Sequence, residues 1–129
     1  MADYLLDTNV LILALRSDPK ALDLLDALDR KREHVCISVA TRTEILAGMR
    51  PHEEERTIEL LGSLDNLLVD EITADQAGRL IYQYACQGIQ LSFPDALIAA
   101  TALHHGLTLA TTNPKHFPIP DLRLQPLGE

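Results

Sequence analysis

Tyr4-Leu5-Leu6-Asp7-Thr8-Asn9-Val10-Leu11-Ile12 is the stretch that decides the fold, because a short apolar run ends at an acidic residue and a second apolar run follows at once. We interpret residues 4–6 as a buried strand and residues 7–9 as a turn. A helix then runs through residues 10–15, and Thr8 or Asn9 is positioned to cap it.

The same alternation continues to the end of the chain. Short apolar runs predict further strands at 35–37, 67–69 and 107–110, with a candidate edge strand at 122–124. Apolar residues at helical spacing predict helices at 20–32, 38–49, 53–64, 73–87 and 92–105, with a capping box at Thr73-Ala74-Asp75-Gln76. Strands that alternate with helices predict an α/β fold, a three-layer sandwich with a mainly parallel sheet flanked by helices. We expect residues 1–129 to form a single domain.

The composition restricts both the core and the function. Hydrophobic residues make up 47%, aromatic residues only 4%, and Trp is absent, so the core must consist mainly of Leu, Ile, Val and Ala. The formal net charge of -8 argues against a generic nucleic-acid binder, which usually has a basic surface. Two interpretations remain: an ordinary acidic protein, or one whose carboxylates converge on a divalent cation that lets the site accept a phosphate.

The two cysteines and the N-terminus predict a cytoplasmic protein. Cys36 and Cys86 lie in apolar surroundings without metal-motif spacing, so we expect both to be buried thiols in a reducing compartment. Asp3 and Asp7 interrupt the N-terminus, where a signal peptide would be apolar. No apolar run approaches the length of a membrane span, so no membrane association is expected.

Four polar residues fall where a doubly wound sheet binds ligands, outside the carboxyl ends of its strands. Asp7 and Asn113 follow the first and last predicted buried strands, Asp95 lies in the first turn of the final helix, and Glu44 lies within the helix after the second strand. Carboxylate and amide oxygens are the ligands that magnesium and manganese prefer. The spacing therefore predicts a cation site at this edge.

Each of these residues also has a structural interpretation. Asp7 could cap the first helix, and Ser92-x-x-Asp95 and Thr41-x-x-Glu44 have the spacing of capping boxes. Asn113 precedes a proline and is typical of a turn. In favour of a site, Glu44 and Asp95 each adjoin an apolar run. A carboxylate in such surroundings needs solvent, a partner charge or a metal.

Other chemistries lack their residues. Dinucleotide and P-loop glycine motifs are absent, as is the nucleophile elbow of serine hydrolases. His104 and His105 are adjacent on a helix and cannot face one metal together. His116 lies in the loop after Asn113, where a solvated loop residue is the alternative to a functional one.

The ordered set of motifs resembles the PIN-domain ribonucleases, and within them the VapC-like toxins of type II toxin–antitoxin systems. The resemblance covers essentially the whole chain. Its pieces are Leu6-Asp7-Thr8-Asn9-Val10-Leu11-Ile12, Thr43-Glu44-Ile45-Leu46-Ala47-Gly48, Asp95-Ala96-Leu97-Ile98-Ala99-Ala100-Thr101-Ala102-Leu103 and Gly106-Leu107-Thr108-Leu109-Ala110-Thr111-Thr112-Asn113-Pro114-Lys115-His116-Phe117.

The resemblance implies an α/β sandwich whose acidic pocket binds magnesium or manganese and hydrolyses RNA. Asp7, Glu44 and Asp95 match the three acidic positions of the family. Thr111 matches a small hydroxyl residue that supports the pocket, and Asn9 matches the residue that steadies the first aspartate. Asp7 and Asp95 would hold the metal, and Glu44 would complete its shell, directly or through water, or help to take a proton.

Two positions depart from the family pattern. The fourth acidic position is Asn113 here, and His116 stands where some relatives have an acid, which puts a second metal site in doubt. Arg42, Arg50 and Lys115 are candidates to position the RNA backbone, with ordinary surface charge as the alternative.

The resemblance also implies partners, namely a small cognate antitoxin and a second copy of the chain. Leucine-rich helices at 21–28 and 58–64 could supply the apolar surface of a homodimer. The alternatives are a PIN-type RNA-processing nuclease without an antitoxin and a non-catalytic PIN-like module, which the departure at Asn113 keeps open. A receiver-like domain would use Asp70 after the third strand, but no lysine lies between residues 31 and 115 to complete its site.

Overall fold

The computed structural model describes residues 3–127, which fold around a five-stranded sheet. The strands are β1 (Tyr4–Leu6), β2 (Val35–Ser38), β3 (Asp65–Leu67), β4 (Thr108–Thr111) and β5 (Leu124–Pro126). They pair in parallel in the order β3-β2-β1-β4-β5. The chain moves outward from central β1 through β2 to β3, then crosses to β4 and β5 on the other side. The topological switch point therefore lies between β1 and β4.

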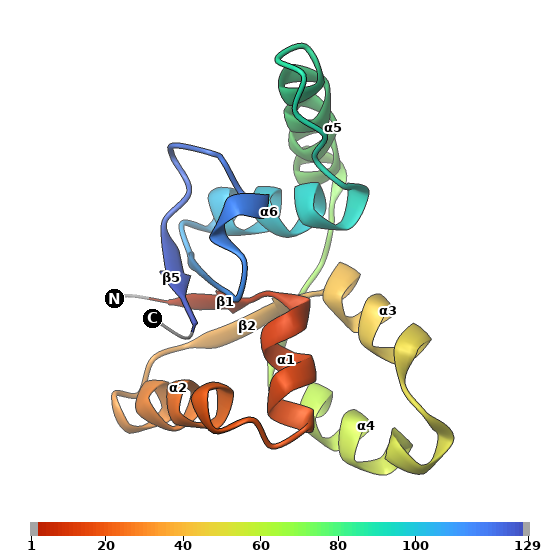
Figure 1. Ribbon diagram of the computed structural model, residues 1–129, viewed down its shortest axis with the longest axis vertical. Helices are drawn as coiled ribbons and strands as arrows, with labels where there is room; N and C mark the ends of the chain where they lie inside the picture. Colours follow the sequence, from red (N-terminus) through yellow and green to blue (C-terminus); the bar gives the residue numbers. More distant parts are fainter. Residues whose placement is uncertain (1–2, 128–129) are drawn as a thin grey trace.

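Helices cover both faces of this sheet, which confirms the predicted three-layer sandwich. The helices are α1 (Thr8–Leu15), α2 (Pro19–Arg30), α3 (Val39–Gly48), α4 (Glu54–Gly62), α5 (Glu71–Ala85) and α6 (Phe93–His105), with 3-10 turns η1 (Pro51–Glu53) and η2 (Pro114–His116). Figure 1 shows α1, α2 and α4 below the sheet and α6 above it. Helix α5 packs against α6 and extends away from the sheet (Figure 1).

Alternating strand residues divide the core between the two faces. Leu5 and Leu109 point into the cluster formed with α6, whereas Leu6 and Ile37 point into the cluster with α1, α3 and α4. Helix α6 contributes five apolar side chains with no exposed area: Ala96, Ile98, Ala99, Ala100 and Ala102. The middle of the last helix therefore lies wholly inside the core. Gly106 ends it in the left-handed conformation, with φ of 66°.

The third strand was predicted two residues too late. It spans Asp65–Leu67, and Leu68, predicted to be inside the sheet, is 74% exposed. The cause is the next helix, which begins at Glu71 with Asp70 as its N-cap. The Thr73 N–H donates to Asp70 Oδ1 at 2.8 Å, so the predicted capping box beginning at Thr73 is wrong. Asp70 therefore caps α5 and is not part of a receiver-like site.

The two cysteines differ from their common prediction. Both are free thiols, but Cys36 is buried in β2 whereas Cys86 is exposed just after α5. Cys86 is exposed because the C-terminal end of α5 extends beyond the sheet that buries Cys36 (Figure 1). Within residues 3–127, no helix is both long and apolar enough to cross a membrane.

Candidate active site at the carboxyl end of the sheet

Asp7 lies at the switch point of the sheet. It directly follows β1, which pairs with β4, and it is the N-cap of α1. The side chain is buried, with 5% of the residue exposed. Its carboxylate accepts hydrogen bonds from the Thr8 N–H and from the Thr111 hydroxyl, both at 2.8 Å. Asp7 therefore caps the helix and is also held in a defined orientation by the neighbouring strand.

The electrostatic environment of Asp7 opposes its negative charge. Burial raises the pKa of the Asp7 carboxyl above its ordinary value. The hydrogen bonds from Thr111 and Thr8 lower this pKa, and the negative charges of Asp95 and Glu44 raise it further. The fold thus brings Asp95 and Glu44 close enough to oppose the negative charge of Asp7, which is the condition that a bound cation would relieve.

Glu44 is connected to Asp7 through the next residue along the chain. The Thr8 hydroxyl donates to Glu44 Oε1 at 2.7 Å, and its oxygen lies 3.1 Å from the buried Thr41 hydroxyl. Ser38 is the N-cap of α3, so Thr41 lies inside this helix and the proposed Thr41-x-x-Glu44 box is wrong. Thr8 and Thr41 were not assigned to the site, although Thr8 adjoins Asp7 in the stretch that decides the fold.

Asp95 joins the cluster from the opposite layer. Ser92 caps α6 by accepting from the Asp95 N–H at 3.2 Å, while the Asp95 carboxylate lies 3.8 Å from His116 Nδ1. Asn113 Nδ2 lies 2.9 Å from His116 Nε2, and the Asn113 N–H donates to the Thr111 hydroxyl at 3.1 Å. Side chains from the β1–α1 junction, β4, α3, α6 and η2 are thereby connected around one end of the sheet.

Asn9 has a different place from the one the resemblance implies. It is exposed, and the hydrogen bonds to the Asp7 carboxylate come from Thr8 and Thr111. The Thr111 hydroxyl makes the supporting contact expected of it. Thr8, and not Asn9, is the neighbour in the chain that holds Asp7, and its hydroxyl also reaches Glu44.

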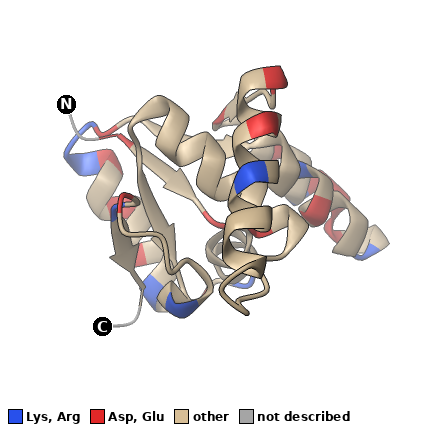
Figure 2. Cartoon of the chain, turned by 90° about the horizontal axis from the view of Figure 1, so that it is seen from above, with Lys and Arg blue, Asp and Glu red and all other residues tan. Residues whose placement is uncertain are grey.

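The candidate RNA-binding residues are dispersed. Arg42 donates from Nη1 to Asn66 Oδ1 at 3.0 Å, so its guanidinium lies beside β3. Arg50 is exposed just before η1. Lys115 is exposed in η2, two residues after Asn113. Figure 2 shows Lys and Arg spread over several elements and interspersed with acidic residues.

The spacing of the three carboxylates limits how they could bind an ion. Among residues 3–127, one group of at least three His, Cys, Asp or Glu side chains places its ligand atoms within 4.8 Å of one another, and it lies elsewhere, at His34, Cys36 and Asp65. Water could complete the shell of a cation beside Asp7. Hard divalent cations, magnesium above all, retain water in this way.

A groove adjoins Glu44 on the α1 side. Its lining includes the apolar side chains of Ile12, Leu15, Ile45 and Met49, together with the charged residues Arg16 and Glu53.

Comparison with known proteins agrees with this architecture. Residues 4–120 match the PIN domain family. Ribonuclease VapC19 of Mycobacterium tuberculosis is 37% identical over 120 residues, which cover 92% of this chain and 96% of the relative. The chain belongs to the PIN domain family.

Solved structures of toxin–antitoxin complexes have the same fold. VapBC2 from Rickettsia felis, bound to a DNA fragment from its promoter, matches with a TM-score of 0.85 at 25% identity, over 95% of this chain and 97% of that one. A toxin–antitoxin complex from Klebsiella pneumoniae matches with a TM-score of 0.79 at 32% identity, over 93% and 95%. The resemblance to VapC-like PIN ribonucleases is confirmed.

Proposed function

We propose that this protein is a divalent-metal-dependent endoribonuclease and the toxin of a type II toxin–antitoxin pair, acting in the cytoplasm. One observation carries the proposal. A buried aspartate at the switch point has a raised pKa and feels the charges of two further carboxylates, Glu44 and Asp95. An arrangement that costs stability in this way is characteristic of a functional site. The ribonuclease relatives supply the reaction class.

The donor set suits a hard cation. Asp7 and Asp95 would hold Mg²⁺ or Mn²⁺, which, when bound, lowers the pKa of a coordinated water and offsets phosphate charge. Thr111 and the Thr8 N–H keep the Asp7 carboxylate oriented. Glu44, held by the Thr8 hydroxyl, is available to orient a water or accept its proton.

Asn113 and His116 would act on the other side of the site. Their side chains are hydrogen-bonded to each other, and His116 lies beside the Asp95 carboxylate. Asn113 contributes an amide oxygen without charge, so these residues favour one strongly held ion over two. Lys115 is the basic residue next to this pair in the chain and is our first candidate for contact with the RNA backbone. Arg42 is engaged with Asn66 and ranks lower.

The antitoxin would be recognised by the acidic cluster and the groove beside it. An apolar segment in the groove lined by Ile12, Ile45 and Met49 would place an adjacent arginine next to Glu44. A guanidinium can pair with carboxylates in the place of a metal and so block the reaction. The toxin–antitoxin complexes among the structural relatives support such a partner.

A homodimer would cover apolar side chains that the single chain leaves exposed. In the predicted helices, Leu22 and Ile58 are 43% and 44% exposed. Leu68, Tyr82 and Phe93, which lie before, within and after the α5 segment, are 74%, 74% and 70% exposed. The α5 region therefore offers more apolar surface for a partner than the two helices from which the dimer was predicted.

Cleavage of total RNA by the purified protein tests the activity. We expect cleavage with Mg²⁺ or Mn²⁺, none with EDTA, and none from Asp95→Asn with either metal. The matched control is Asp23→Asn, an exposed change on α2 that should leave cleavage intact. Metal-independent cleavage, or a fully active Asp95→Asn variant, would reject the assignment.

Co-expression with the neighbouring small gene tests the toxin role separately. We expect the chain alone to slow growth and the pair to form a complex that neither slows growth nor cleaves RNA. Active cleavage without toxicity or complex formation would favour an RNA-processing nuclease and leave the site assignment unchanged.

A further inference from the structure

A second group of potential metal ligands lies at the opposite end of the sheet from the carboxylate cluster. His34 directly precedes β2, Asp65 is the first residue of β3, and Asp3 directly precedes β1. These are the amino ends of three neighbouring strands, whereas Asp7 follows the carboxyl end of β1. The group therefore has no part in the reaction proposed above.

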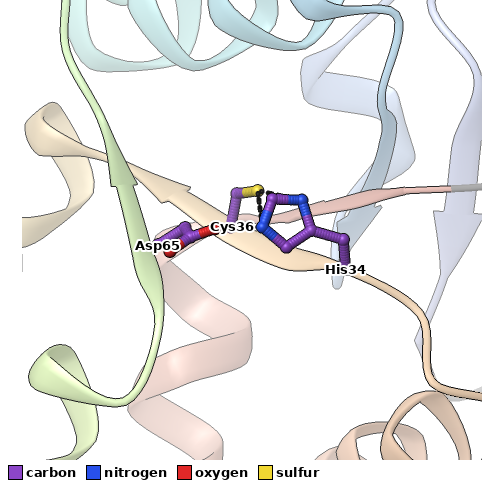
Figure 3. Close-up of side chains that lie close together, drawn as sticks. All are labelled: His34, Cys36 and Asp65. Atoms are coloured by element: carbon purple, nitrogen blue, oxygen red, sulfur yellow. Dashed lines mark hydrogen bonds and ion pairs between the residues drawn. The ribbon is translucent and has the colours of Figure 1, made fainter.

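Strand register places these side chains on one face. Cys36 is the register partner of Asp65 in the parallel β2–β3 pair, and His34 is two residues before Cys36 in the chain. Figure 3 shows the sulfur of Cys36 facing the ring of His34, with Asp65 reaching in from β3. The sulfur lies 3.6 Å from His34 Nδ1 and 4.0 Å from Nε2, and Asp65 Oδ2 contacts Nε2.

Two features distinguish this group from an ordinary surface ion pair. The His34 and Asp65 side chains are 50% and 61% exposed, which is unremarkable for a histidine–aspartate pair. Behind them, however, lies the Cys36 thiol, with 1% of the residue exposed. The buried Asp3 Oδ1 has no hydrogen-bond partner, and the charge of Asp3 acts on Cys36. An unpaired buried carboxylate oxygen is costly and calls for a positive partner.

We propose that His34, Cys36 and Asp65 bind a zinc ion, with Asp3 as the carboxylate available for the fourth position. Imidazole nitrogen, thiolate sulfur and carboxylate oxygen together are a zinc ligand set, in contrast to the all-oxygen set at Asp7. For Zn–S near 2.3 Å and Zn–N near 2.05 Å at a tetrahedral angle, sulfur and nitrogen would lie about 3.6 Å apart. The Cys36 sulfur already lies at this distance from His34 Nδ1, and it lies 4.0 Å from Nε2, the nitrogen that Asp65 contacts.

Zinc at this site would stabilise the fold. The ion would join the ends of β2 and β3, and of β1 if Asp3 also binds, and so hold the edge strand β3 to the sheet. Burial, with the charges of Asp65 and Asp3, raises the pKa of the Cys36 thiol to about 11. The thiol is therefore protonated before binding, and zinc must displace its proton.

Metal titration of the full chain in an Asp7→Asn, Asp95→Asn background tests the proposal, because this background removes the two carboxylates proposed to hold the other cation. We expect one Zn²⁺ per chain and, with Co²⁺, a thiolate-to-cobalt absorption band that Zn²⁺ displaces. Cys36→Ser should abolish the band. The matched control Cys86→Ser changes the exposed thiol and should leave it unchanged.

Two changes at exposed side chains avoid dependence on a buried substitution that could impair folding. His34→Gln and Asp65→Asn should each weaken Zn²⁺ binding at least tenfold, with unaltered circular dichroism. Zinc at about 100 times its Kd should raise the unfolding midpoint of the background protein by roughly 10 °C. Absence of the thiolate band, or Zn²⁺ affinity unaffected by His34→Gln and Asp65→Asn, would overturn the proposal.

Discussion

Replacing Asp7 by asparagine should abolish cleavage and at the same time stabilise the metal-free protein. The substitution removes one buried negative charge and leaves the shape nearly unchanged. Asparagine can still accept the Thr8 N–H that Asp7 accepts at 2.8 Å, and it is about as good an N-cap as aspartate. Its amide can also remain hydrogen-bonded to the Thr111 hydroxyl, so the change isolates the effect of charge.

The direction of the stability change follows from the raised pKa of Asp7. A neutral side chain loses the attraction of a carboxylate to the α1 N-terminus, worth about 0.3–1 kcal/mol. The neutral asparagine avoids the cost of burying a charge and the repulsion from Asp95 and Glu44. In their effect on the Asp7 pKa, these two costs together outweigh the two hydrogen bonds. Relieving strain at a functional site commonly gains roughly 0.5–2 kcal/mol, and we expect about 1 kcal/mol here. For 129 residues this corresponds to about 4 °C in the unfolding midpoint.

The pH dependence has a defined sign. Because the pKa of Asp7 is higher in the folded protein than in the unfolded chain, the native state binds its proton more tightly. Ionised Asp7 therefore destabilises the wild type at neutral pH. This penalty is lost as pH falls from the raised folded pKa to the unfolded value of about 3.9. The advantage of Asp7→Asn should be full at pH 7.5 and shrink on acidification through that window.

Urea unfolding with EDTA at pH 7.5 and at mildly acidic pH measures this difference. Asp23→Asn, on the exposed face of α2, is the matched control and should change stability by less than about 0.5 kcal/mol. Manganese should then stabilise the wild type and not Asp7→Asn. If Asp7→Asn were less stable than the wild type in EDTA by 1 kcal/mol or more, the carboxylate would be chiefly a helix cap and our electrostatic reasoning would be refuted.

Three further substitutions test other parts of the structure. Thr111→Val removes the hydroxyl that donates to Asp7, so calorimetric Mn²⁺ affinity should fall about 10–100-fold; affinity within twofold of the wild type would contradict this. Asn113→Asp should retain cleavage and bind Mn²⁺ at least as tightly, and tenfold weaker binding, about 1.4 kcal/mol, would place this side chain outside the metal site. Gly106→Ala forces a Cβ onto a residue with φ of 66° in open space, so urea unfolding should show a loss of about 1–2 kcal/mol with cleavage unchanged. Equal stability of this variant would argue against the left-handed helix end.

The order of elements could be predicted from the sequence because β1, β2 and β4 form around short apolar runs, and segments with helical spacing separate these strands. The ends of elements were less predictable where two signals compete. The composition of residues 67–69 is typical of a strand. However, Asp70 caps α5, so the strand ends at Leu67 and the next two residues lie outside the sheet. The strand gains its register from Cys36 pairing with Asp65, a contact between distant residues that composition does not encode.

The site was predictable to the extent that it follows from strand ends. Asp7 and Thr111 adjoin the paired strands β1 and β4, so their contact follows from topology. The Thr8–Glu44 hydrogen bond was missed because it depends on how α3 packs against α1. The His34, Cys36 and Asp65 group was missed for a similar reason, since its members are brought together by strand pairing and have no motif spacing.

The helix-capping role, which the sequence left open for Asp7 and Asp95, differs at the two positions. Ser92 caps α6 through the Asp95 N–H, which leaves the Asp95 carboxylate beside His116. Asp7 itself is the cap of α1, because it lies between the end of β1 at Leu6 and the start of α1 at Thr8. A cap needs one carboxylate oxygen, and here Oδ1 takes the helix N–H while Oδ2 takes the Thr111 hydroxyl. Each oxygen keeps a further lone pair, so the same side chain can start the helix and hold a cation. A substitution that preserves only the cap, such as Asp7→Asn, is therefore the change that separates folding from catalysis.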